Sequence, residues 1–385
     1  MLDFYQISEL LTSEELQIQN SVRDYVSTNI DSNIAHWWSE GTLPSHLITD
    51  FGSAGLLGAN LSSDYGMSGI SNVAYGLVMY ELEKADSGLR SFVSVQGALV
   101  MYPILTYGSQ EQRDHYLPKM AKGELVGCFG LTEPDGGSDP GAMSTVAYKD
   151  GDHYILNGIK MWITNGTIAD VALIWARDEN QDVRGFLVDT NTKGFQANQI
   201  NRKLSLRVSD TAELVLNDVR VHQSNMLPGV TGLKGPLSCL TQARFGISWG
   251  ALGALEAVYL EALAFAQSRK TFGQAIASRQ LVQAKLADML SNHTKGLLLA
   301  WRLARLKDQG KISFAQVSLA KRDNVRSALL AARSSREILA ASGVTLDYQT
   351  IRHMLNLETV DTYEGTFDIH SLILGRDITG FNSLG

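Results

Sequence analysis

Residues 153–165 read HYILNGIKMWITN, and this stretch decides the fold expected for the 385-residue chain. It is rich in β-branched and aromatic residues and is interrupted by Gly and Asn, which is typical of strands joined by turns. Similar short segments follow one another from about residue 124, whereas apolar residues on both sides recur about every 3.6 positions, which indicates helices. The sequence therefore predicts a helical domain over residues 1–122, a β domain over 123–235 and a helical bundle over 236–385.

This order of elements predicts an α+β multi-domain protein and excludes a doubly wound dinucleotide-binding fold. Such a fold needs strands and helices to alternate, and no GxGxxG motif follows a strand here. Thr12 and Glu15 form a capping box ahead of the first helical stretch.

Composition excludes several classes of function. Hydrophobic residues make up 44% and charged residues 19%, as in ordinary globular proteins. The net charge of -7, without a Lys/Arg-rich stripe, argues against nucleic-acid binding. The eight histidines and the two cysteines, Cys128 and Cys239, show no metal-binding spacing, so no metal site is expected and both thiols should be buried.

No signal or transit peptide is visible at the N-terminus, and no window approaches eighteen uncharged apolar residues. A cytoplasmic protein without a membrane span is expected.

The first segment with chemical potential is CFGLTEPDGGSDPGAM, residues 128–143. Gly136 and Gly137 permit positive φ, and the hydroxyls of Thr132 and Ser138 can hold polar ring atoms or a phosphate-bearing ligand. The alternative is a plain loop between strands.

The second segment is GIKMWITNG, residues 158–166, in which Trp162 and Thr164 share one face of a strand. An aromatic ring beside a hydroxyl suits stacking on a flat heterocycle. The alternative is packing of the tryptophan in the core.

The third segment is SRKTFGQAIASRQ, residues 268–280, a Gly-interrupted turn between two long helices. Arg269 could clamp a pyrophosphate, within its own subunit or in a neighbouring one. Alternatively, its charge only complements the helix dipole.

The fourth segment is DTYEGTFDIH, residues 361–370, which places Glu364 just before a helix. The carboxylate is either a general base or a solvated or capping residue.

Together these segments resemble the flavin-dependent acyl-CoA dehydrogenases, because LTEPDGGSDPG, KMWITNG, RKTFGQAI and TYEGTFDIHSLILGR stand in that family's order and at its spacing. The resemblance extends from about residue 10 to the end of the chain. The stretches ELEKADSGLRSFVSVQ, GCFGLTEP and DTYEGTFDIHSLILGR are most similar to the glutaryl-CoA dehydrogenases. An acyl-CoA dehydrogenase-like fold implies an N-terminal α-helical domain, a central β-barrel or sandwich domain and a C-terminal four-helix bundle.

The resemblance implies FAD as the cofactor, bound between the β domain and the bundle. The residues that it implies around the flavin are Phe129, Leu131, Thr132, Gly137, Ser138, Trp162, Ile163, Thr164 and Thr366. Those that it implies at the adenosine diphosphate part, partly across a subunit boundary, are Arg269, Phe272, Gln280, Glu337, Ile338, Leu339, Ala340 and Ala341.

Glu364 is implied as the base that removes the α-proton of an acyl thioester while a hydride passes from Cβ to flavin N5. Its backbone N–H and a flavin hydroxyl would polarise the thioester oxygen. Burial beside Tyr363 would raise the pKa of Glu364 toward roughly 6 to 7, where a general base works best. Gly365 would leave room for the thioester.

The resemblance implies glutaryl-CoA as substrate, because Arg90, with Ser91 and Glu83, matches the residues that hold a distal carboxylate. Decarboxylation would then give crotonyl-CoA and CO2. From the residues alone, Arg90 could instead be a surface arginine paired with Glu83. Ser138, Tyr363 and Gly365 are further implied substrate contacts, and Arg244 is implied at the CoA moiety unless it only caps a helix.

Further implications are an electron-transfer flavoprotein as partner, a homotetramer, and a role in lysine and tryptophan degradation. Two departures stand out: residues 340–343 read AASG where relatives have GGNG, and Phe367 replaces a histidine. Three alternatives stay open: another acyl-CoA or acyl-carrier substrate, dehydrogenation without decarboxylation, and a thioester-binding or scaffold protein without catalysis.

Overall fold

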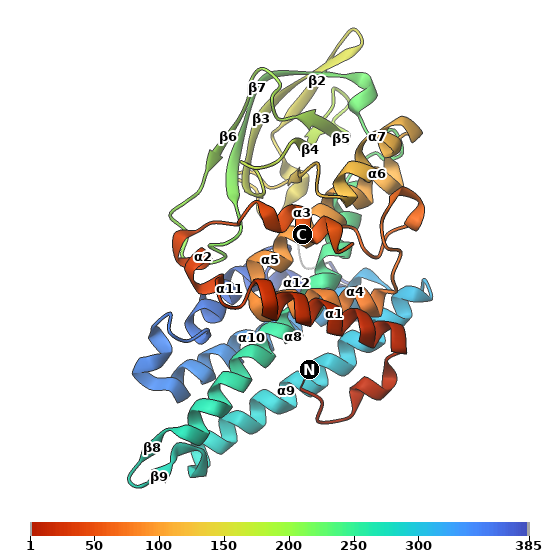
Figure 1. Ribbon diagram of the computed structural model, residues 1–385. Helices are drawn as coiled ribbons and strands as arrows, with labels where there is room; N and C mark the ends of the chain where they lie inside the picture. Colours follow the sequence, from red (N-terminus) through yellow and green to blue (C-terminus); the bar gives the residue numbers. More distant parts are fainter. Residues whose placement is uncertain (1, 383–385) are drawn as a thin grey trace.

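The computed structural model describes residues 2–382 and places a group of helices between a curled sheet and a long helical bundle (Figure 1). The N-terminal helices are α1 (Ser13–Asn29), α2 (Ile34–Glu40), α3 (His46–Ser53), α4 (Asn72–Ala85), α5 (Ser87–Ser94), the π-helix η3 (Val95–Met101), α6 (Tyr102–Tyr107) and α7 (Gln110–Ala121). The capping box of Thr12 and Glu15 at the start of α1 is confirmed. Five residues separate the end of α7 from the first strand.

The middle part is one seven-stranded sheet in the order β1-β4-β2-β3-β7-β6, with β5 paired to β4. Its strands are β1 (Gly127–Gly130), β2 (Val146–Asp150), β3 (His153–Thr164), β4 (Val171–Arg177), β5 (Val183–Asp189), β6 (Phe195–Gln199) and β7 (Thr211–His222). The pairings of β1 and β2 with β4 are parallel and the others are antiparallel. The stretch that decided the expected fold is thus the central strand β3, confirmed at nearly its full length.

The C-terminal part is a bundle of long helices. It contains α8 (Lys234–Ser268), α9 (Gln280–Asp308), α10 (Phe314–Leu339), α11 (Thr350–Thr362) and α12 (Phe367–Thr379). A two-stranded hairpin, β8 (Lys270–Thr271) with β9 (Gln274–Ala275), joins α8 to α9 and projects from the far end of the bundle (Figure 1). A short turn separates α11 from α12, and Glu364 lies in this turn.

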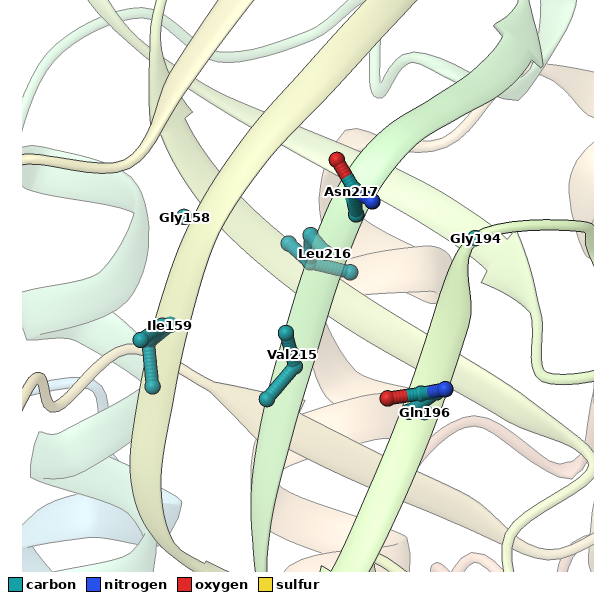
Figure 2. Close-up of a pocket in the computed structure, with 7 residues that line it drawn as sticks. All are labelled: Gly158, Ile159, Gly194, Gln196, Val215, Leu216 and Asn217. Atoms are coloured by element: carbon teal, nitrogen blue, oxygen red, sulfur yellow. The ribbon is translucent and has the colours of Figure 1, made fainter.

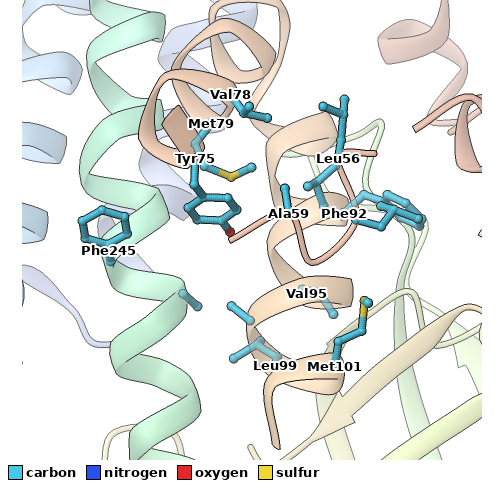
Figure 3. Packing of buried hydrophobic residues seen from close by; sticks show 14 of the residues in the cluster. Leu56, Ala59, Tyr75, Val78, Met79, Phe92, Val95, Leu99, Met101 and Phe245 are labelled. Carbon is cyan, nitrogen blue, oxygen red and sulfur yellow. The ribbon is translucent and has the colours of Figure 1, made fainter. Parts of the chain in front are cut away.

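One hydrophobic core joins the N-terminal helices to the bundle. Tyr75 of α4 stacks on Phe245 of α8 with ring centroids 6.3 Å apart, and Phe92 and Leu99 extend the cluster toward the sheet (Figure 3). Cys128 and Cys239 are free and buried, which confirms the expectation for both thiols.

Among residues 2–382, two helical stretches are long and apolar enough to cross a membrane. They are Ser87–Tyr107 and Lys234–Ser268, and 89% and 72% of their most apolar windows are buried inside the protein. Because core helices pass the same test, these stretches are weak evidence for a membrane span.

Candidate active site

Glu364 lies in the turn between α11 and α12 with a backbone φ of 53°. Its Oε2 is shielded from solvent and has no hydrogen-bond partner. Burial raises the pKa of Glu364 to about 7, an effect that Arg90, Arg244 and Lys321 partly offset. A carboxyl group with this pKa can accept a proton near neutral pH. Glu364 as a whole is half-buried, but its Oε2 is not a solvated surface oxygen, which favours the general base over the solvated alternative.

Arg90 on α5 is fully buried beside this turn. Its Nε lies 2.5 Å from Oε2 of Glu83, and its Nη2 donates a hydrogen bond to the hydroxyl of Tyr363. Ser87 donates to the other oxygen of Glu83 over 2.9 Å. The Nη1 of Arg90 is buried without a partner. The pairing with Glu83 is confirmed, but the arginine is not at the surface, and one of its donors is left free.

Gly250 on α8 makes room for this ion pair. A Cβ atom at this position would lie 2.1 Å from Oε2 of Glu83 and 3.2 Å from Nε of Arg90. Real Cβ atoms essentially never approach another heavy atom below 3.0 Å. The pair between α4 and α5 therefore depends on a glycine in a third helix.

Arg244 lies within α8 and is nearly buried, so it does not cap a helix. Its Nε donates to the backbone carbonyl oxygen of Glu364 over 2.7 Å. Gly365 has φ of 94°, and a Cβ there would lie 3.0 Å from Nε2 of His370 and 3.2 Å from Nη2 of Arg244. Arg244 thus contacts the backbone of the candidate base, and Gly365 is needed for the close packing around it.

Trp162 on β3 projects away from the core, with 61% of its surface exposed and φ of 63°. The pairing of β3 with β7 shifts register between Lys160 and Ile163, and both of these side chains are buried. Trp162 and the half-buried Thr164 therefore share the outward face, and the core-packing alternative is wrong for Trp162. An exposed indole held in an unfavourable backbone conformation suits stacking against a ligand ring.

The loop after β1 is anchored by a buried ion pair. Nζ of Lys160 lies 2.8 Å from Oε1 of Glu133, and Glu133 accepts hydrogen bonds from the backbone N–H groups of Ser144 and Thr145. Of the residues predicted to contact the flavin in this domain, Phe129, Leu131 and Ile163 are buried, Thr132 is half-buried, and Gly137 and Ser138 are exposed. The loop is therefore fixed at its base and open at its glycines.

The residues predicted at the adenosine diphosphate part fall into two groups. Arg269, Phe272 and Gln280 lie on or beside the β8–β9 hairpin, where Phe272 is 98% exposed. Arg269 and Arg244 are 25 residues apart on the same helical run, which corresponds to roughly 37 Å along α8. The hairpin is therefore remote from Glu364 of its own chain.

The second group lies at the end of α10. Glu337 pairs with Lys285, while Ile338 and Leu339 are buried in the bundle core and offer a ligand only backbone atoms. Ala340 has φ of 53° and ψ of -127°, a conformation typical of glycine. Ala341 is exposed in the 3-10 helix Ala340–Val344 that follows α10. Thr366 caps α12, its Oγ1 accepting from the backbone N–H of Ile369 over 3.1 Å.

The contacts among residues 2–382 bring Glu364, Tyr363, Gly365, Arg90, Glu83 and Arg244 into one cluster. Ser91 lies buried next to Arg90 on α5. Two further residues of the cluster were not predicted from the sequence: Lys321 on α10, which binds backbone carbonyl groups of the same turn, and the buried His370. Nothing in the run AKRDNVR distinguishes Lys321 from an exposed helix residue.

A shallow pocket of about 370 Å³ lies elsewhere, on the sheet (Figure 2). It is lined by Gly158, Ile159, Gly194, Gln196, Val215, Leu216 and Asn217. None of these side chains is ionisable, so the pocket offers no acid or base. Within residues 2–382, no group of three His, Cys, Asp or Glu side chains is placed to hold a metal ion.

A helical domain, a curled sheet and a helical bundle, with a buried carboxylate at Glu364, define an oxidoreductase of the acyl-CoA dehydrogenase fold. Family profiles described as the N-terminal, middle and C-terminal domains of acyl-CoA dehydrogenase match residues 12–124, 128–219 and 231–379. The chain belongs to the acyl-CoA dehydrogenase family. The family uses FAD, which confirms the predicted cofactor.

Similar proteins give closer resemblances. The crystal structure of a glutaryl-CoA dehydrogenase from Mycobacterium smegmatis is 52% identical, with a TM-score of 0.97 over 99% of this chain and 98% of that one. A second glutaryl-CoA dehydrogenase structure from Mycobacterium smegmatis, in complex with FADH2, is 49% identical, with a TM-score of 0.98 over 100% and 99% of the chains. The human mitochondrial short-chain specific acyl-CoA dehydrogenase is 32% identical over 96% of this chain and 91% of its own length.

Proposed function

We propose that this acyl-CoA dehydrogenase acts on glutaryl-CoA and releases crotonyl-CoA and CO2. The observation that carries the proposal is the fully buried Arg90 with a free Nη1 in the same cluster as Glu364. The glutaryl-CoA dehydrogenases at 52% and 49% identity support it.

The residues present fit FAD. The exposed Trp162 at positive φ, with Thr164 on the same face, would lie against the flavin ring, and Thr132 and Ser138 would bind its polar edge. When bound, FAD supplies the acceptor for the hydride that leaves Cβ of the substrate.

Glu364 removes the α-proton in this proposal. The α-C–H of a thioester is a very weak acid, so the base must be desolvated and the thioester oxygen must be polarised. Burial provides the first condition, since Oε2 has neither solvent nor a hydrogen-bond partner. The backbone N–H of Glu364 provides the second, and one such donor is typically worth about 2.7 to 4 kcal/mol of barrier.

Arg90 selects the substrate in this proposal. Its Nη1 would donate to the distal carboxylate of glutaryl-CoA, whereas a monocarboxylic acyl chain would leave this buried donor unpaired. After dehydrogenation, the electron pair of the bond to the distal carboxyl carbon can delocalise toward the thioester, so that CO2 leaves. Protonation of the resulting carbanion gives crotonyl-CoA.

The alternative within the family is another acyl thioester, on CoA or a carrier protein, or dehydrogenation without decarboxylation. The 32% identity to a short-chain specific acyl-CoA dehydrogenase keeps this alternative in view.

The proposed assembly is a homotetramer that passes electrons to an electron-transfer flavoprotein. The remote hairpin with its 98% exposed Phe272 supports contact with a cofactor in a second copy. A cytoplasmic location and a role in lysine and tryptophan degradation stay predictions.

Anaerobic titration of the purified flavoprotein tests the proposal. Glutaryl-CoA should bleach the flavin absorbance and release CO2, whereas butyryl-CoA should cause little bleaching. Efficient bleaching by butyryl-CoA, with none by glutaryl-CoA, would contradict the proposed substrate. Bleaching by glutaryl-CoA without CO2 would support the non-decarboxylating alternative, and a colourless protein without flavin would support the scaffold alternative.

A further inference from the structure

Lys321 on α10 is a buried lysine whose donors all meet one turn. Its Nζ lies 2.9 Å from the carbonyl oxygen of Gly365, 3.1 Å from that of Tyr363 and 3.4 Å from that of Asp361. Only 1% of the residue is exposed. Three acceptors match the three N–H donors of an ammonium group, so the geometry is that of the charged form.

These contacts define the shape of the turn that carries Glu364. The carbonyl groups of Tyr363 and Gly365 point to Lys321, whereas the carbonyl group between them, that of Glu364, points to Arg244. This alternation goes with φ of 53° at Glu364, a conformation that is unfavourable for a residue with a Cβ atom. Two buried cations on two different helices hold the backbone in that conformation.

We propose that Lys321 is a positioning residue for the dehydrogenation, whose charge and hydrogen bonds hold the turn 361–365 so that the carboxylate of Glu364 meets the substrate. This inference rests on the proposed role of Glu364 as the base.

The charges around Lys321 support an electrostatic part of this role. Burial lowers the pKa of Lys321 to about 7, and the carboxylates of Asp361 and Glu364 raise it again. In return, the charge of Lys321 lowers the pKa of Glu364. The charged and titratable groups that face Lys321 are Arg90 from α5, Arg244 from α8, Asp361 from α11, Glu364 in the turn and His370 from α12.

His370 does not compete for this role at neutral pH. Burial, together with Lys321 and Arg244, lowers its pKa to about 3, so the ring stays neutral. Removal of the Lys321 charge should therefore raise the pKa of Glu364.

The test compares Lys321→Met with wild type and with Lys307→Met. Lys307 is a matched control because it is another lysine of the bundle, half-buried on α9. Burial lowers its pKa to about 8, and its Nζ donates to Asn72. Each protein is mixed anaerobically with an acyl-CoA that reduces the wild-type flavin, across a range of pH. A parallel infrared titration without substrate follows the carboxylic C=O band that Glu364→Gln removes.

We expect Lys321→Met to slow the limiting rate of flavin reduction by about tenfold or more, while the Kd of the acyl-CoA changes less than about threefold. Both the pH midpoint of the rate and that of the infrared band should move up by about one pH unit. Lys307→Met should keep the wild-type rate and both midpoints.

A wild-type limiting rate with unmoved midpoints in Lys321→Met would overturn the proposal. If this variant is not recovered with flavin, Lys321→Gln decides, because it keeps two N–H donors without the charge: a raised infrared midpoint supports the proposal and an unmoved one overturns it. If no acyl-CoA bleaches even the wild-type flavin, the proposed function itself fails, which is a different outcome from unperturbed variants of an active wild type.

Discussion

Substitution of Arg90 separates substrate anchoring from fold stability, provided that its buried partner is changed with it. Arg90→Ala alone would leave Glu83 fully buried without its cation. Breaking a buried ion pair in this way costs about 3 to 5 kcal/mol. A loss of activity in Arg90→Ala could therefore result from unfolding alone. In the double variant Glu83→Gln with Arg90→Met, both charges are absent and Ser87 can still donate to position 83.

The expected loss of specificity follows from the free Nη1 of Arg90. A buried charge-assisted contact to a carboxylate is worth about 2 to 5 kcal/mol, and about 1.4 kcal/mol corresponds to a factor of ten. The kcat/KM for glutaryl-CoA should therefore fall by roughly 100-fold relative to that for butyryl-CoA. Of the cations near Glu364, Arg90 lowers its pKa the most, so the variant should also need a higher pH for both substrates.

The assay is flavin reduction by both acyl-CoAs at about pH 7 and pH 9, where the ratio of the two kcat/KM values cancels the shared change in the base. Thermal unfolding of wild type, Arg90→Ala and the double variant shows how much of the stability the second substitution restores. A ratio that stays the same as in wild type would refute the reasoning that Arg90 anchors a carboxylate.

Three further substitutions test the site. Glu364→Gln should keep the yellow colour and thioester binding but show no flavin bleaching, and reduction near the wild-type rate would assign the base to another group. Because folding raises the pKa of Glu364 from 4.5 to about 7, its stabilising contribution is complete below pH 4.5 and is lost as the pH rises through about 7. In chemical denaturation above that pH, Glu364→Gln should therefore be more stable than wild type by about 3 kcal/mol. Gly250→Ala should cost about 3 kcal/mol or more, because the new Cβ would displace Glu83 from Arg90, and unchanged denaturation would show that the helices adjust. Ala340→Gly should stabilise the protein by about 1 kcal/mol by removing backbone strain, and a lower Tm would contradict this.

The elements that local patterning determines were predictable, as the confirmed capping box at Thr12 and the strand over residues 153–164 show. The exposure of Trp162 could not be predicted. Strand alternation places Trp162 and Ile163 on opposite faces of the sheet, but it does not say which face is covered by protein. The role of Lys321 could not be predicted from the sequence, because its burial depends on how α12 packs against α10, and no short sequence pattern determines this packing. The positive φ of Glu364 is likewise a product of tertiary contacts with cations from two other helices.

The pKa of Glu364 depends on the fact that the nearby cations do not bind its carboxylate directly. Arg90, Arg244 and Lys321 all lower the pKa of Glu364, yet within residues 2–382 none forms an ion pair with its carboxylate. Each is directed to another acceptor: Arg90 to Glu83 and Tyr363, and the other two to backbone carbonyl groups of the turn. A direct ion pair would hold the carboxylate ionised but weakly basic, whereas burial alone would keep it protonated at neutral pH. Because the cations bind neighbouring acceptors instead, the pKa of Glu364 stays near 7. At this pKa the carboxylate is both ionised and basic enough to remove a proton from carbon.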